Sequence, residues 1–526
     1  MTKIQKEKPI LITGATGYVG GRLVPALLEA GYRVRAMGRN LEKLGCRPWA
    51  RHERVELVRG DVLDLESLTK AATGCWAAYY LVHSMIAQKE KFVEADRQAA
   101  HNMVKASATA GLERIIYLGG LAEAKQGALS KHLLSRIEVA KILQSGPVPT
   151  TDLRAPMILG SGSASFEILR YLVEHLPVMI TPRWVQSLNQ PIAIRNVIGY
   201  LVGCLSHDET TGQTYDIGGP DVLTYRHLLD IYAQEAGLRK RLIVPVPVLT
   251  PTLSAYWINF ISPVPTAIAL PLTEGLTSEA VCTENRIQSI IPQELLSCRD
   301  AIRTALDKVK QEQVDTCWMD AGAMLEPEWA HCGDAQWAGG TILSCGYRVR
   351  IRATAEEIWG PISRIGGRTG WYHLDALWRL RGLIDRLVGG AGLRRGRRHP
   401  SELMVGDALD FWRVLKVDPP QQLLLLAEMK TPGEAMLEFR LMPVGDNQTE
   451  LQMLSRFLPL GLGGLLYWYF LYPFHEWVFY GMLKSIARSI NRPLVNGPAR
   501  FTPRLTASCA MPSTLAGKSP GDAARR

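Results

Sequence analysis

Short apolar runs alternate with amphipathic stretches along the first third of the chain. The run at residues 9–13 leads into a glycine-rich turn, and residues 22–31 then place apolar side chains at helical spacing. Similar runs follow at residues 32–39, 55–61, 77–84 and 112–120, with a second helical pattern at residues 92–111. This alternation predicts an α/β domain, a doubly wound Rossmann parallel sheet with helices on both faces.

The pattern continues beyond this core. Residues 151–160 and 214–219 read as two further strands, whereas the Pro-, Trp- and Tyr-rich stretch at residues 242–271 is poorly suited to a Rossmann core. We expect it to belong to a substrate-side subdomain at about residues 155–290. An amphipathic helix at residues 297–313 closes the first domain, which we place at residues 1–312.

The second half has a different pattern. A strand at residues 341–352 precedes a helix at residues 353–366 that starts with a Thr and has acidic residues in its first turn. Long strands separated by short links follow at residues 406–418, 422–430, 435–444 and 449–459, and they lead to an apolar helix at about residues 463–490. These elements predict an α+β domain at residues 313–500, followed by a disordered tail at residues 501–526.

Residues 458–483 are long and apolar enough to raise the question of a membrane span. Pro473, His475 and Glu476 interrupt the centre of this stretch, where a charge is costly in lipid. A buried helix is therefore favoured, with peripheral membrane contact as the alternative. The nearby arginine run, Arg394, Arg395, Arg397 and Arg398, fits either an anionic headgroup or a solvated loop, and it is too short to indicate a nucleic-acid partner.

Composition adds two constraints. The 526 residues carry a formal net charge of +10, which favours anionic partners such as cofactor phosphates or anionic lipid. The nine cysteines contain no C-x-x-C pair, so neither a metal site nor a disulfide framework is predicted. Together with an N-terminus that does not resemble a secretory leader, this favours a cytoplasmic protein with possible membrane association. The oligomeric state is left open.

The turn TGATGYVG contains the most specific chemical signal. Gly14 permits a tight turn, Gly17 lets backbone amides approach a pyrophosphate, and Gly20 lets the following helix pack on the sheet. The helix N-terminus attracts the phosphates. The motif lies between a predicted strand and a predicted helix, which is the context that a dinucleotide site requires.

The end of the second strand distinguishes the two nicotinamide cofactors. An acid there would bind the ribose 2′-hydroxyl, but this chain has Arg39, which can pair with a 2′-phosphate. NADP(H) is therefore predicted, with NAD(H) as the alternative. The predicted cofactor-binding residues are Thr13, Gly14, Thr16, Gly17, Tyr18, Val19, Gly20, Arg39, Asp61, Val62, Leu81 and His83.

The TGxxGxxG spacing, the GD pair after the third strand and the later LRxPxxLG pattern resemble the short-chain dehydrogenase/reductase superfamily, especially its atypical NmrA-like branch. The stretches RGLIDRLVGGAGLRRGRR and LLYWYFLYPFHEWVF resemble the DUF2867 domain that follows such a unit in a bacterial group of NAD(P)-binding proteins. The order of elements in this second domain also resembles the helix-grip fold of START-like proteins, which implies an apolar cavity.

Active members of the superfamily use a Tyr-x-x-x-Lys pair to move a proton to the substrate carbonyl. In KHLLSRIEVAK the matching positions hold His132 and Arg136, and Gly119 or Gly120 stands where a serine is expected. We therefore predict His132 as general acid and Arg136 as its orienting partner. The leading hypothesis is an NADP(H)-dependent oxidoreductase acting on a small apolar carbonyl or quinone-like molecule. The alternatives are a non-catalytic NADPH sensor or assembly factor and a lipid-binding protein.

Overall fold

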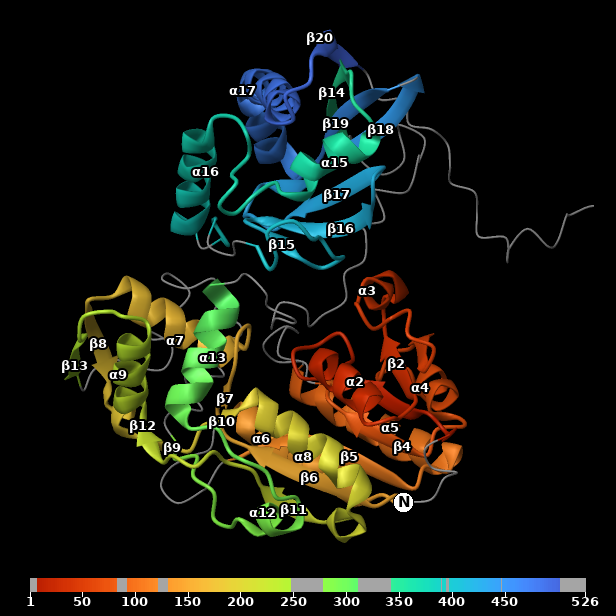
Figure 1. Ribbon diagram of the computed structural model, residues 1–526, viewed down its shortest axis with the longest axis vertical. Coiled ribbons are helices and arrows are strands. Elements are labelled where there is room, and N and C mark those ends of the chain that lie inside the picture. Colours follow the sequence, from red (N-terminus) through yellow and green to blue (C-terminus); the bar gives the residue numbers. More distant parts are fainter. Residues whose placement is uncertain are drawn as a thin grey trace, which may run out of the picture. The chain divides into compact units, whose positions relative to one another are not determined.

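The computed structural model describes residues 7–82, 92–121, 131–246, 278–310, 342–388, 390–393, 397–445 and 447–501. The chain divides into two compact units, here called unit 1 (mainly residues 1–323) and unit 2 (mainly residues 324–526). Each unit contains a seven-stranded sheet with helices, but the two sheets differ in strand direction (Figure 1). The predicted boundary at residues 312–313 and the predicted tail after residue 501 lie outside the described residues.

The sheet of unit 1 is parallel throughout, in the order β11-β6-β5-β4-β1-β2-β3. Its strands are β1 (Ile10–Thr13), β2 (Val34–Gly38), β3 (Val55–Arg59), β4 (Ala77–Tyr80), β5 (Arg114–Gly120), β6 (Thr150–Ala155) and β11 (Thr214–Asp216). The chain winds in one direction from β1 to β3 and in the other from β4 onward. The strand order therefore reverses beside β1, where open α/β sheets bind their ligands.

Alternation along β1 separates the two helical layers. Ile10 and Ile12 pack in a cluster with side chains of α2 (Gly20–Glu29) and α8 (Ile194–Ser206). Leu11 instead joins a cluster with side chains of α4 (Leu65–Ala72), α5 (Phe92–Ala110) and α6 (Lys131–Gln144). Successive strand residues point to opposite faces of a sheet, so both faces of this one are covered (Figure 1). The doubly wound fold is confirmed.

A further hydrophobic cluster lies beside the main sheet, between α7 (Ala164–His175), α9 (Tyr225–Glu235) and α13 (Cys298–Lys310). Three small two-stranded sheets accompany these helices. Their strands are β7 (Ile158–Leu159), β8 (Val178–Pro182), β9 (Leu188–Asn189), β10 (Ile192–Ala193), β12 (Leu223–Thr224) and β13 (Leu242–Val246). Residues 247–277, which hold most of the predicted Pro-, Trp- and Tyr-rich stretch, lie outside the described residues.

The remaining elements of unit 1 are short. They are α3 (Leu41–Gly45), η1 (Arg183–Gln186), η2 (Asp208–Thr210) and α12 (Arg286–Ile290). The helix α3 follows β2 directly, and Asn40 caps its N-terminus by accepting a hydrogen bond from the backbone N–H of Lys43 at 3.0 Å. This cap fixes the path of the chain immediately after Arg39.

The sheet of unit 2 is antiparallel, in the order β15-β16-β17-β18-β19-β14-β20. Its strands are β14 (Leu343–Ile351), β15 (Ala408–Leu409), β16 (Trp412–Asp418), β17 (Gln422–Ala427), β18 (Gly433–Gly445), β19 (Gln448–Pro459) and β20 (Leu494–Phe501). The helices are α15 (Ala355–Ser363), α16 (Asp375–Leu387) and α17 (Gly461–Ser489). An antiparallel C-terminal α+β unit is confirmed, whereas the helix-grip assignment stays a prediction.

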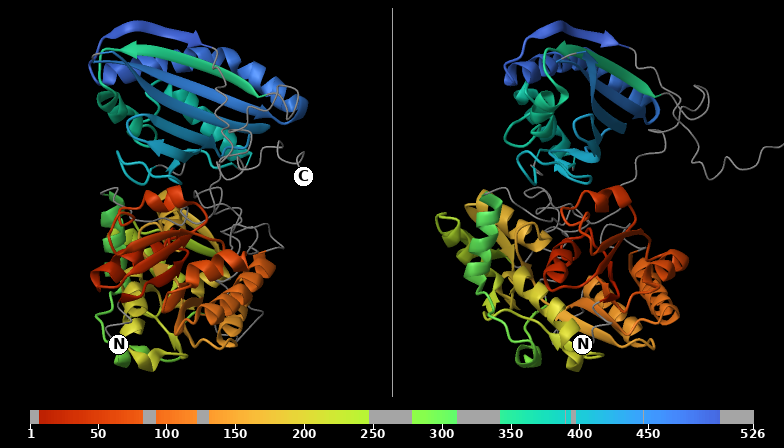
Figure 2. Two further views of the ribbon diagram at one scale, coloured as in Figure 1. Left: turned by 90° about the vertical axis from the view of Figure 1, so that its right-hand side faces the viewer. Right: turned by 45° about the vertical axis from the view of Figure 1, so that its right-hand side comes forward.

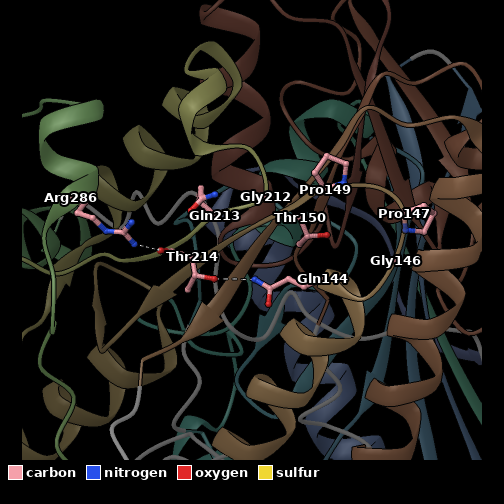
Figure 3. Close-up of a pocket in the computed structure, with 9 residues that line it drawn as sticks. All are labelled: Gln144, Gly146, Pro147, Pro149, Thr150, Gly212, Gln213, Thr214 and Arg286. Carbon is pink, nitrogen blue, oxygen red and sulfur yellow. Dashed lines mark hydrogen bonds between the residues drawn. The ribbon is translucent and has the colours of Figure 1, made fainter.

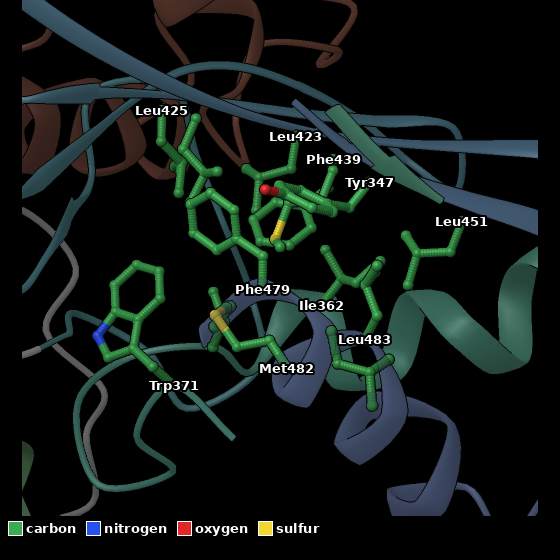
Figure 4. Packing of buried hydrophobic residues seen from close by; sticks show 14 of the residues in the cluster. Tyr347, Ile362, Trp371, Leu423, Leu425, Phe439, Leu451, Phe479, Met482 and Leu483 are labelled. Atoms are coloured by element: carbon green, nitrogen blue, oxygen red, sulfur yellow. The ribbon is translucent and has the colours of Figure 1, made fainter. Parts of the chain in front are cut away.

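The core of unit 2 lies between its sheet and α17, which packs on β14, β19 and β20 (Figure 2). Tyr347 and Phe439 from the sheet meet Phe479 and Met482 from α17, and Trp371 joins the same cluster (Figure 4). A reciprocal capping box at Thr354 and Glu357 starts α15, as the sequence predicted for that helix. Of the tryptophans in this half, Trp371, Trp378, Trp412 and Trp468 are core residues.

Three features of unit 2 depart from the sequence prediction. The single strand predicted at residues 406–418 is wrong, because Asp410 adopts a left-handed conformation (φ 57°) and separates β15 from β16 as a hairpin. Asp410 also accepts a hydrogen bond from the indole N–H of Trp371 at 2.9 Å, which anchors the turn in the core. Neither α16 nor β20 was predicted from the sequence.

Candidate functional site

The glycine turn between β1 and α2 leaves almost no room for side chains. Gly14 has φ +76°, and a Cβ built on it would stand 2.8 Å from the carbonyl oxygen of Leu81. A Cβ on Gly20 would lie 2.2 Å from the Gly14 carbonyl oxygen. A Cβ on Gly17 would meet only that same oxygen, at 3.2 Å. Gly14 and Gly20 are thus required by the protein's own packing, whereas a side chain at Gly17 would need only a small shift of the Gly14 carbonyl.

This turn fits a dinucleotide pyrophosphate. Among the described residues, no side chain caps the N-terminus of α2 at Val19, and the positive end of the helix dipole there attracts phosphate oxygens. The turn is held in shape by a hydrogen bond from the Gly17 N–H to the Gly14 carbonyl at 2.9 Å. Thr13 is fully buried, donates to the Tyr79 carbonyl at 3.0 Å and accepts from the Leu81 N–H at 3.3 Å. Thr13 therefore connects β1 to β4.

Tyr18 and Arg22 connect the turn to the segment that follows β7. The Arg22 guanidinium lies over the Tyr18 ring, 4.3 Å from its centroid, and donates to the Ser161 carbonyl at 2.9 Å. A Cβ on Gly160 would come 2.5 Å from the Tyr18 hydroxyl oxygen. The glycine at position 160 therefore lets this segment approach the glycine turn closely.

The predicted adenosine side lies at the ends of β2 and β3, which neighbour each other in the sheet. Arg39 follows β2 directly and its side chain is exposed. Asp61 accepts a hydrogen bond from the Leu63 N–H at 3.0 Å, and the neighbouring Val62 is buried. The arrangement puts a cation and a fixed loop at the same edge of the sheet as the glycine turn.

Arg47 is a residue of this region that sequence reasoning missed. It follows α3, is 95% buried, and donates to the Thr16 carbonyl at 3.0 Å. A buried guanidinium thus lies against the glycine turn and adds positive charge where a phosphate would sit. No sequence motif indicated Arg47, because this residue reaches the glycine turn only after α3 folds back toward it.

The catalytic candidates lie on α6. His132 is half-buried in the first turn of this helix, and Arg136 follows one turn later. The Arg136 guanidinium lies 5.3 Å from the centroid of the Tyr117 ring and donates to the Leu118 carbonyl. These contacts tie α6 to β5. His83, which the sequence predicts to bind the cofactor, lies outside the described residues.

The structure explains why glycine replaces serine at the end of β5. A Cβ on Gly119 would lie 2.7 Å from the Oδ1 atom of Asp152, which comes from the neighbouring strand β6. At Gly120 a Cβ would meet Leu133 of α6 at 3.4 Å, an ordinary contact. The Asp152 carboxyl thus fills the space that a side chain at position 119 would need.

Asp152 is a second residue that the sequence analysis missed. Its side chain is 4% exposed, and its Oδ1 atom has no hydrogen-bond partner in the part of the chain that the structure describes. Burial raises the pKa of Asp152 to about 6, although Arg154 and Arg136 lower it and Asp216 raises it further. An aspartate within the predicted strand at residues 151–160 was the available signal. A titratable carboxyl therefore lies directly beneath Gly119.

We predict that Asp152→Asn makes the chain more stable at neutral pH. The folded protein holds the Asp152 proton more tightly than the unfolded chain does, because the pKa rises from 3.8 to about 6. The free energy of unfolding therefore decreases as pH rises through this interval, and above the interval Asp152 lowers it no further. The shift corresponds to at most about 3 kcal/mol.

Urea unfolding of the full chain on both sides of pH 6 measures this effect. The variant should lose the decline in stability that the wild type shows between acidic and neutral pH. Asp307→Asn changes an exposed aspartate of α13 and serves as the control. Identical pH dependence in the wild type and Asp152→Asn would contradict the prediction.

A separate pocket opens at the opposite edge of the unit 1 sheet (Figure 3). It is bordered by Pro149 and Thr150 at the start of β6 and by Thr214 at the start of β11. Gln144 donates to Thr214 at 2.9 Å, and Arg286 donates to the Thr214 carbonyl at 3.0 Å. None of the predicted site residues lines it. Among the described residues, no group of three His, Cys, Asp or Glu side chains could hold a metal ion.

The family comparisons agree with this geometry. Residues 14–143 match a family model described as NAD(P)H-binding. Fold and site thus define an NAD(P)H-binding domain within unit 1. Residues 337–482 match a second model, described as a protein of unknown function (DUF2867). The DUF2867 match thus follows the NAD(P)H-binding match along the chain.

Curated relatives match parts of the chain. Cinnamoyl-CoA reductase 1 of Petunia hybrida is 30% identical over 120 residues, which cover 21% of this chain and 35% of that protein. Ceramide reductase of Caulobacter vibrioides is 29% identical over 171 residues, covering 32% of this chain and 52% of that protein. The chain thus spans only about a third to a half of the length of these two relatives.

Two solved structures are similar to the chain over slightly more than half of its length. Triphenylmethane reductase of Citrobacter sp., complexed with NADP(H), is 21% identical with a TM-score of 0.46, covering 56% of this chain and 99% of that one. The NADPH-dependent quinone oxidoreductase of Escherichia coli is 18% identical with a TM-score of 0.46, covering 56% and 98%.

Proposed function

We propose that the chain is an NADPH-dependent reductase of an apolar carbonyl or quinone-like molecule. The observation that carries the proposal is the glycine turn at the reversal point of the parallel sheet, where Gly14 and Gly20 leave no room for a side chain and, among the described residues, no side chain caps α2. The curated relatives include reductases named for cinnamoyl-CoA and ceramide. Their names support reduction as the reaction class.

Each group of residues has a proposed role. When bound, NADPH supplies the hydride. The glycine turn binds the pyrophosphate, and Arg39 pairs with the 2′-phosphate, beside the positive charge of Arg47. His132 holds the proton that the reduced oxygen receives. Arg136 is a positioning residue, because its contacts with Leu118 and Tyr117 fix α6 against β5.

Steady-state NADPH consumption with a panel of quinones, aldehydes and ketones tests the proposal. We expect turnover of at least one apolar member of the panel and weaker turnover of its short, polar analogue. Tight NADPH binding without consumption by any member would contradict a reductase. One observation favours that second function, an NADPH sensor: His132 and Arg136 occupy the positions where active relatives carry tyrosine and lysine.

We predict that Arg39→Asp reverses the cofactor preference. The carboxylate would repel the 2′-phosphate of NADPH and accept a hydrogen bond from the 2′-hydroxyl of NADH. Loss of a charge-assisted pair should weaken NADPH binding roughly tenfold or more. Calorimetric titration with both cofactors measures the change.

Arg33→Asp is the matched control for this variant. Arg33 is also exposed, but it precedes β2 and thus lies at the opposite edge of the sheet. It should leave both affinities unchanged. Equal NADPH affinity in wild type and Arg39→Asp would remove Arg39 from the site.

A further inference from the structure

The helix α16 of unit 2 turns an apolar face outward. Leu380, Leu383, Ile384, Leu387 and Val388 recur at helical spacing, and each is between 51% and 70% exposed. The buried residues of the same helix are Trp378, Gly382 and Asp385. The aliphatic stripe therefore lies on the face opposite to the core, which is the reverse of what an ordinary surface helix presents.

The first two-thirds of α17 also expose large apolar side chains on the face that points away from the core. Its core face carries Trp468, Val478 and Phe479. Its other face exposes large apolar side chains at 45–78%, including the residue that precedes the helix: Leu460, Leu462, Leu466, Tyr469, Phe470, Phe474 and Trp477. Aromatic rings are concentrated in this second set. Contiguous exposed apolar surface of this kind marks an interaction site.

The two helices border one another. Arg381 of α16 donates to the Tyr467 hydroxyl of α17 at 2.6 Å. His373 precedes α16 in the chain, and its ring centroid lies 6.4 Å from that of Trp477, which follows Tyr467 in α17. Figure 1 shows α17 nearly end-on and α16 from the side, so the two helices cross at a large angle. We call their exposed apolar residues, taken together, the α16–α17 surface.

Positive charge accompanies the α16–α17 surface. Arg379 is exposed on α16, where Arg386 is half-buried, and Lys484 and Arg488 are exposed on the later turns of α17. Acidic groups are fewer. Asp375 accepts a hydrogen bond from the Trp371 N–H, Asp385 is buried and accepts from the Gly392 and Lys430 N–H groups, and Glu476 is the exposed acid of α17.

We propose that the α16–α17 surface docks on an anionic lipid bilayer, with its apolar side chains entering the boundary between headgroups and acyl chains. Aliphatic and aromatic side chains beside arginine and lysine are the composition of helices that lie in a membrane interface. In the described part of the chain, no helix is long and apolar enough to cross a membrane. The docking goes beyond the proposed reductase activity and does not depend on it.

Flotation of the full chain with vesicles tests this proposal. One set of vesicles contains phosphatidylcholine alone, and the other contains phosphatidylcholine with phosphatidylglycerol. We expect flotation with the phosphatidylglycerol vesicles, decreasing at high salt because screening weakens the arginine and lysine contacts. No flotation with these vesicles would overturn the proposal, and equal flotation with both sets would overturn the assignment to anionic headgroups.

The variant Leu383→Glu/Leu387→Glu places two charges on the α16–α17 surface and should lower vesicle binding on the order of tenfold or more. The matched control is Met442→Glu/Val444→Glu, which changes two exposed apolar residues of β18. The control should bind as the wild type does. An equal loss in both would overturn the proposal, because binding would then follow net charge alone.

Two further measurements separate other occupants of this surface. Arg379→Glu leaves the apolar residues in place and should weaken binding only to vesicles with phosphatidylglycerol, which remains informative if the double variant fails to fold. Light scattering gives the oligomeric state of wild type and variants. A dimer that dissociates in Leu383→Glu/Leu387→Glu, without flotation of the wild type, would show that a second copy covers the surface and would overturn the proposal.

Discussion

Gly17→Val is expected to abolish binding of both NADPH and NADH while unit 1 stays folded. A Cβ at this position meets only the Gly14 carbonyl oxygen at 3.2 Å, so the protein itself can accommodate a side chain with a small shift. The branched side chain would instead occupy the space that the pyrophosphate needs. We expect at least about a hundredfold loss of affinity for either cofactor, measured by calorimetry.

Two variants serve as comparisons. Gly20→Val places a Cβ only 2.2 Å from the Gly14 carbonyl oxygen, so it should lower the stability of unit 1 as well as cofactor affinity. Gly497→Val adds the same side chain on β20, where a Cβ meets nothing within 4 Å, and should change neither property. A folded Gly17→Val chain that binds NADPH as the wild type does would mean that the cofactor lies elsewhere.

His132→Ala is expected to lower turnover on the order of 10² to 10⁴ while NADPH affinity stays nearly unchanged. The reason is that His132 is proposed to donate the proton to the substrate and not to bind the cofactor. The pH profile of turnover should also lose a limb near the imidazole pKa, about 6.5 before any effect of the protein. Steady-state kinetics across the pH range, with NADPH titrations at each pH, measure both effects.

His101→Ala provides the control, because His101 is an exposed residue of the adjacent helix α5. Its turnover and pH profile should match those of the wild type. If His132→Ala retains full turnover, another group supplies the proton, and Asp152 beneath Gly119 is the next residue to change. If wild type binds NADPH but consumes none, the sensor function gains support.

The sequence was sufficient for the cofactor turn because that feature is local. Gly14, Gly17 and Gly20 lie within seven residues, and the strand and helix that flank them have clear apolar spacing. The doubly wound sheet followed in the same way, since alternating strands and helices have few other arrangements. The antiparallel sheet of unit 2 was predictable from successive strands joined by short links.

Features that depend on distant residues were not predictable. Asp152 faces Tyr117 only because β6 pairs with β5 in that register, and Arg47 reaches Thr16 only after α3 folds back. The hairpin at Asp410 escaped notice because an aspartate, not a glycine, adopts the left-handed conformation there. The outward orientation of α16 was also not predictable. The spacing of its apolar residues does not say whether they pack in a core, and in the structure they are exposed.

Transfer of deuterium from the cofactor tests the proposed reductase most directly. The wild-type chain is incubated with NADPH labelled with deuterium at C4 of the nicotinamide and with each member of the panel, and both cofactor consumption and the products are measured. For an aldehyde or ketone the account predicts a product that gains one deuterium on carbon from labelled NADPH and none at that position from deuterated solvent; for a quinone, whose hydroquinone O–H groups exchange with solvent, it predicts consumption of the labelled NADPH. Tight binding of labelled NADPH without its consumption, and without deuterium in any aldehyde or ketone product, would contradict it.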